Sequence, residues 1–147
     1  FIIYKAVEVD NFNLGLVSFL IALISMSFFF TKPEPISLVT IYIQNAKEFL
    51  WHKIKLAVRN TLLLSLPFIL ILLGFFPDEI LLVTAAVLFG LLFTLTSLLG
   101  KYAYFPSEMN VIQSIALVLC LVPPPLVIIV IPVFYKKALA NLNPLLS

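Results

Sequence analysis

The sequence predicts an all-α fold: a polytopic helical membrane protein with about four transmembrane segments and one amphipathic interfacial helix. Hydrophobic residues make up 63% of the chain, charged residues only 11%, and the mean hydropathy is +1.18. A soluble domain is typically about half apolar and about a quarter charged. The apolar residues gather in four long runs with almost no charge, and the basic residues lie between or beside these runs. This pattern excludes a water-soluble protein.

The four runs cover residues 14–31, 61–76, 80–100 and 111–135. A hydrocarbon core about 30 Å thick needs about 20 apolar residues in a helix, and the runs approach or exceed that length. The first run is followed by Thr31-Lys32-Pro33 instead of a small-residue cleavage site, which favours a retained span over a signal peptide. The chain begins at Phe1 without an initiator Met, so we expect it to be part of a longer protein.

The segment 36–60 has the pattern of an amphipathic helix. Its apolar residues recur at steps of three and four and form one stripe: Ile36, Val39, Ile43, Ala46, Leu50, Ile54 and Ala57. The opposite face carries Glu48, His52, Lys55 and Arg59, and Pro33 and Pro35 precede the helix, where proline is accepted. We expect a cytoplasmic helix along the membrane interface, with Trp51 at headgroup depth. It either only positions the spans or docks a cytoplasmic partner through its polar face.

The third run, 80–100, contains small residues spaced by four. Ala86, Gly90 and Thr94 fall on one helical face. Lipid supplies no hydrophobic drive for helix pairing, so close approach at small residues matters more in a membrane than in water. The stripe predicts a helix-packing face, used either within the chain or in an oligomer.

The last run is interrupted by Pro123-Pro124-Pro125, which we interpret as a hinge. Basic residues favour the cytoplasmic side, so the loop 32–60 is placed inside. Four simple spans leave six basic residues inside and three outside, whereas a re-entrant hairpin at the prolines gives eight and one. The arms of such a hairpin are too short to span fully. Both readings remain open, and the sequence slightly favours a single kinked or broken span.

Candidate chemistry is sparse along the chain. His52 is the only histidine and Cys120 the only cysteine, so a nucleophile–base pair, a disulfide and a Cys/His metal cluster are excluded. The acidic residues all lie outside the apolar runs, which argues against an ion-coupled transporter. No phosphate-binding glycine loop occurs, and a net charge of +2 does not indicate nucleic acid. We therefore expect no catalytic residue, no cofactor and no metal.

One resemblance fits this layout. A span, then Lys32-Pro33-Glu34-Pro35-Ile36-Ser37-Leu38, then an amphipathic helix leading into the next span, resembles the membrane subunits of type-2 ABC exporters over residues 14–100. The resemblance implies a cytoplasmic coupling helix that contacts a nucleotide-binding subunit. The chain departs from the family because it lacks a first span and a clear cytoplasmic C-terminal span.

Two functions follow as expectations. The first is a permease-type module that moves a substrate and is driven by a partner ATPase, with Glu48, His52, Lys55 and Arg59 as the coupling residues. The alternative is a non-catalytic structural or assembly subunit of a larger membrane complex. Both place the protein in a bilayer, either a plasma membrane or a bacterial inner membrane, as part of an oligomer or complex and without nucleic acid.

Overall fold

The structure is a computed structural model that describes residues 1–41, 45–107 and 125–146. These residues form helices and no strand, which confirms the predicted all-α class. In chain order the elements are α1 (Ile2–Glu8), α2 (Phe12–Phe28), α3 (Ile36–Thr40), α4 (Ala46–Phe75), η1 (Pro77–Glu79), α5 (Ile80–Tyr104) and α7 (Pro125–Leu146).

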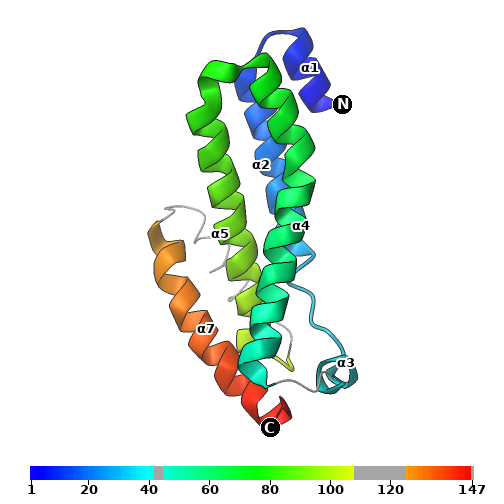
Figure 1. The fold of residues 1–147 in the computed structure, drawn as a ribbon, viewed down its shortest axis with the longest axis vertical. Coiled ribbons are helices and arrows are strands. Elements are labelled where there is room, and N and C mark those ends of the chain that lie inside the picture. The colour runs from blue at the N-terminus through cyan, green and yellow to red at the C-terminus, as the bar shows by residue number, and fades with distance from the viewer. Residues whose placement is uncertain (42–44, 108–124, 147) are drawn as a thin grey trace.

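The long helices α2, α4 and α5 run side by side, and α7 packs along the C-terminal half of α5 (Figure 1). The helix α1 and the turn η1 lie at one end of the bundle. The helix α3, the start of α4 and the C-terminus lie at the other (Figure 1). Asn11 and Asn45 begin α2 and α4 by accepting hydrogen bonds from the main-chain N–H groups of Leu14 and Glu48. The helices α2, α5 and α7 run in one direction and α4 runs in the opposite direction (Figure 1).

The predicted interfacial helix 36–60 and the predicted span 61–76 differ from the structure. The segment Ile36–Thr40 forms the short helix α3, and Ala46–Phe75 is one continuous helix of 30 residues. At about 1.5 Å per residue, α4 is about 45 Å long. A polar face followed by an apolar run does not force a helix to end, and α4 also continues through Pro67, which has no N–H group to donate. The amphipathic part of α4 is thus the N-terminal part of one long helix.

The C-terminal segment also differs from the single-span reading of 111–135. The helix α7 runs to Leu146, well past the predicted end at 135, and its C-terminus lies at the same end of the bundle as the end of α5 (Figure 1). Ala138 and Leu142 are buried there against the start of α4. Pro123 and Pro124 of the predicted hinge lie outside the described residues, and Pro125 begins α7. The choice between one kinked span and a re-entrant hairpin depends on residues 111–124, which lie outside the described residues.

Two clusters of buried side chains hold the bundle together. One joins α2, α4 and α5 near η1 through Phe19, Leu23, Leu72, Val83 and Ala86. The other lies at the opposite end and includes Phe49, Leu50, Leu98, Tyr102 and Leu142. The interior is therefore packed at both ends of the bundle.

Many large apolar side chains lie on the outside of the bundle. Among the described residues two helical segments, Ala46–Phe75 and Pro77–Tyr104, are long and apolar enough to cross a membrane, so the predicted count of about four spans is not confirmed; α2 is a shorter apolar helix of 17 residues. Only 22% of the most apolar 18-residue window of α4 and 39% of that of α5 are buried inside the molecule. Large aliphatic side chains therefore cover the outer faces of both helices.

Candidate functional site

A charged cluster lies where the segment after α2 crosses α4 and α5. Glu34 Oε1 accepts hydrogen bonds from Lys53 Nζ at 3.1 Å, Lys101 Nζ at 3.0 Å and the Tyr102 hydroxyl at 3.2 Å, and its Oε2 accepts from Lys53 Nζ at 2.9 Å. The Lys101 side chain is 5% exposed, that of Lys53 13% and that of Glu34 26%. One carboxylate thus ties a loop to two long helices.

Aromatic rings support the two cations of this cluster. Lys101 Nζ lies 4.7 Å from the centroid of the Tyr102 ring, and Lys53 Nζ lies 5.3 Å from that of Phe49. The Phe49 and Tyr102 rings contact each other edge to face at 5.5 Å. The negative face of an aromatic ring attracts a cation, so the rings offset part of the excess positive charge. The cluster consists of two lysine side chains, two aromatic rings and one carboxylate.

The electrostatics of Glu34 favour the ionised carboxylate. Burial raises its pKa, but the hydrogen bonds from Lys53 and Lys101 and the positive charges of both lysines lower it by more. The pKa of Glu34 therefore lies below its ordinary value of 4.5. Glu34 is thus ionised near neutral pH and pairs with both lysines.

Charge is distributed unequally between the two ends of the bundle. The basic end is defined here as the loop between α2 and α4, the first half of α4, the end of α5 and the second half of α7. It carries eight basic residues against Glu34 and Glu48, a net charge of +6 among the described residues: Lys32, Lys47, Lys53, Lys55, Arg59, Lys101, Lys136 and Lys137. The opposite end carries Lys5 against Glu8, Asp10, Asp78 and Glu79, a net charge of −3.

The predicted coupling residues lie together on the first half of α4. Glu48, His52, Lys55 and Arg59 are all exposed, and their spacing of four, three and four places them on one helical face. Trp51, beside this face, is 54% exposed, and Lys55 Nζ lies 5.7 Å from its ring centroid. The four side chains form an accessible polar surface, here called the α4 polar face.

The small residues of α5 lie against α2 and α4. A Cβ added at Gly90 would lie 2.8 Å from Leu23 Cδ2, so only glycine permits the observed approach of α2. The Thr94 and Ser27 hydroxyls are hydrogen-bonded at 2.9 Å, and the Thr61 hydroxyl of α4 donates to Thr94 at 3.4 Å. The stripe of Ala86, Gly90 and Thr94 is thus in contact within the chain, and hydroxyl groups link three helices at its lower end.

The described residues offer few groups for metal binding or nucleophilic catalysis. Within the described residues no group of three or more His, Cys, Asp and Glu side chains could hold a metal ion. Cys120, the one thiol of the sequence, lies outside those residues. The Ser97 hydroxyl is buried and has no hydrogen-bond partner in the described structure. The polar contacts that the structure does show at the basic end are the ion pairs and hydrogen bonds around Glu34.

Sequence reasoning missed the cluster around Glu34. The sequence analysis places all the acidic residues outside the apolar runs and assigns Glu34 no partner. The useful indication is the position of Lys101, a lone charge at the end of a long apolar run that needs a partner when buried. Glu34 lies between Pro33 and Pro35, shortly after the end of the first run.

Comparison with known proteins provides no family for this chain. No protein-family model matches it, and no curated protein or solved structure is similar to it. The function is therefore argued from the geometry and charge described above.

Proposed function

We propose that this chain is an integral membrane protein with its basic end in the cytoplasm. The support is the apolar exterior: leaving large aliphatic side chains in water costs about 25 cal/mol for each Å² of apolar surface, whereas lipid removes that cost. The excess of Lys and Arg at one end follows the bias that orients membrane proteins. The plasma membrane or a bacterial inner membrane is the proposed location.

Within this placement we propose a permease-type module that moves a substrate and draws its energy from a cytoplasmic ATPase. The observation that carries the proposal is that one helix, α4, joins the α4 polar face to the packed interior, with Pro67 inside it. A partner that displaces Glu48, His52, Lys55 and Arg59 would move the part of α4 that precedes Pro67, whose missing N–H group weakens the helix at that point. The resemblance of residues 14–100 to the membrane subunits of type-2 ABC exporters supports the same assignment.

The charged cluster connects α4 to the neighbouring elements of the bundle. Lys53 lies on α4 between the coupling residues, and Glu34 connects it to Lys101 of α5. Motion of α4 at its basic end would therefore be passed to the loop after α2 and to α5. We propose that the cluster is the structural link between docking and the bundle.

The test is charge reversal on the α4 polar face. We expect the double variant K55E/R59E to abolish stimulation of the co-purifying ATPase in proteoliposomes while membrane insertion is unchanged. The matched control is K136E/K137E, which reverses two exposed lysines on α7. Unchanged stimulation in K55E/R59E, or equal loss in both variants, would contradict coupling through α4.

A structural or assembly subunit is the second candidate. The observation that favours it is that the buried hydroxyls of Ser27, Thr61 and Thr94 bond to one another and to helix carbonyls, so they hold helices together. On this proposal K55E/R59E would lose the larger complex on size-exclusion chromatography, with no ATPase among the co-purifying proteins.

A further inference from the structure

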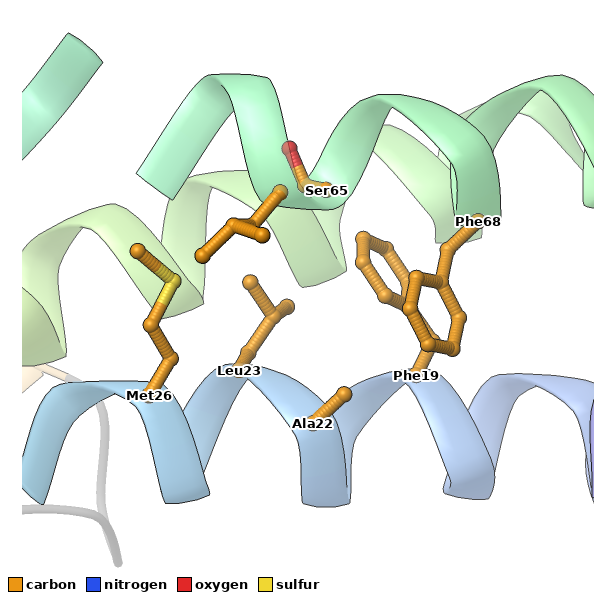
Figure 2. Close-up of a pocket in the computed structure, with 7 residues that line it drawn as sticks. Phe19, Ala22, Leu23, Met26, Ser65 and Phe68 are labelled. Carbon is orange, nitrogen blue, oxygen red and sulfur yellow. The ribbon is translucent and has the colours of Figure 1, made fainter. Parts of the chain in front are cut away.

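An apolar groove runs between α2 and α4 along the outside of the bundle. Its first part has a volume of about 160 Å³. Figure 2 shows side chains of α2 and α4 facing each other across it; the lining residues are Phe19, Ala22, Leu23, Met26, Leu64, Ser65 and Phe68. The Ser65 hydroxyl donates to the Leu62 carbonyl at 2.9 Å, so it presents no unsatisfied polar group. This part of the groove is apolar throughout.

The groove continues toward the basic end. A second hollow of about 380 Å³ shares Met26 and Leu64 with the first, and its other lining residues are Phe29, Phe30, Asn60 and Leu63. The shared side chains place the two hollows next to each other along α2 and α4, and together they are here called the α2–α4 groove. Leu63 and Leu64 are 60% and 59% exposed, so the groove is open sideways.

The two ends of the α2–α4 groove differ. The Phe19 and Phe68 rings are stacked at 5.4 Å, which closes the end nearer η1. The other end carries Asn60, the one side-chain amide among the lining residues. The exposed Lys32 follows the wall residues Phe29 and Phe30 in the loop of the basic end. A ligand that fits this shape has an apolar tail and a polar head directed at the basic end.

The length of the groove matches one leaflet of a bilayer. From Asn60 to Phe68 the helix α4 rises about 12 Å at about 1.5 Å per residue. Half of a hydrocarbon core about 30 Å thick is about 15 Å. The groove therefore extends from the headgroup boundary at the basic end to near the bilayer centre.

We propose that the α2–α4 groove binds one acyl chain of an anionic phospholipid from the leaflet at the basic end. The occupant is chosen by charge: the polar end of the groove opens at the end of the bundle whose net charge is +6. A basic residue near the membrane surface attracts anionic lipid. The inference rests on the membrane placement proposed above and is independent of the ATPase partner.

The experiment measures lipid retained by the full chain. The protein is purified in mild detergent, incubated with equal amounts of phosphatidylglycerol and phosphatidylcholine, and examined by native mass spectrometry. Ala22→Trp fills the groove, and Ile21→Trp places the same ring on the neighbouring residue, which is exposed and does not line the groove. Asn60→Leu removes the polar end only. Circular dichroism checks that each variant is folded.

We expect the wild type and I21W to retain one phosphatidylglycerol with a preference of about fivefold over phosphatidylcholine. A22W should lose the bound lipid, whereas N60L should keep the lipid and its preference, because Asn60 carries no charge. If A22W does not fold, the salt dependence decides: a preference that a higher ammonium acetate concentration leaves unchanged overturns the selection by charge.

Retention by A22W equal to that of the wild type, equal retention of the two lipids by the wild type, or a dimer that A22W dissociates would each overturn the proposal. Recovery of the wild type in the soluble fraction without detergent would instead overturn the membrane placement. Loss of ATPase coupling with lipid retention intact would affect only the proposed function.

Discussion

Replacing Glu34 by Gln tests whether the charged cluster stabilises the bundle. The substitution keeps the size of the side chain but removes the charge that two lysines share, and Lys101 is almost fully buried. Removing one partner of a buried ion pair costs about 3–5 kcal/mol, because the other charge stays buried and unpaired. Glu34 is 26% exposed, so water screens part of the loss and the lower end of that range applies. We expect a loss of about 3 kcal/mol in the free energy of unfolding.

The assay is reversible unfolding of the full chain in mixed micelles, followed by far-ultraviolet circular dichroism. The control is Glu8→Gln, which removes the exposed ion pair with Lys5 at the opposite end and should cost about 0–1 kcal/mol. In E34Q/K101M the second substitution removes a charge left unpaired, so the double variant should be more stable than the sum of the single changes by at least about 1 kcal/mol. Equal stability of E34Q and E8Q, or strict additivity, would refute the account of the cluster.

The remaining predictions concern pH, packing and capping. The pKa of Glu34 is lowered on folding, so the ionised carboxylate stabilises the fold fully above pH 4.5. This stabilisation is lost as the pH falls through the folded-state pKa. E34Q should lack this pH-dependent stabilisation in an acid titration followed by circular dichroism. Gly90→Val should cost about 1–3 kcal/mol, with partial rescue by Leu23→Ala, because the added Cβ meets Leu23; no rescue would contradict that contact. Thr94→Val should cost about 0.6 kcal/mol in unfolding equilibria through the lost hydrogen bond to Ser27. Asn45→Ala should cost about 1 kcal/mol and fray the start of α4, which amide hydrogen exchange would detect.

The features that depend on composition and local period could be predicted from the sequence. The all-helical class follows from the apolar runs, and the exposure of Lys55 and Arg59 agrees with their place on a polar stripe. The fate of the segment 36–60 could not be predicted, because hydrophobic periodicity gives the face of a helix but not whether it joins the next one. The start of α4 is held in the bundle by tertiary packing, because Ala46, Phe49 and Leu50 lie in one buried cluster with residues of α5 and α7.

The Glu34 cluster could not be predicted from the sequence for a different reason. Its partners stand 19, 67 and 68 positions away in the chain, and pairing over such distances depends on the tertiary arrangement of three elements. The path of the C-terminal segment was similarly undetermined. Counting Lys136 and Lys137 favoured the return to the basic end, and the short length of the hairpin arms argued against it. Residues 111–124, on which the choice depends, lie outside the described residues, so both alternatives stay predictions.

The separation of charge between the two ends also makes the bundle sensitive to voltage. The described residues carry +6 at one end and −3 at the other, so inverting the molecule in a membrane would move the equivalent of nine elementary charges across it. Each charge is worth about 2.3 kcal/mol per 100 mV, so a potential of about 100 mV, negative on the basic side, opposes inversion by roughly 20 kcal/mol. On the membrane placement proposed above, the same potential would hold the α4 polar face on the basic side, which that proposal assigns to the cytoplasm.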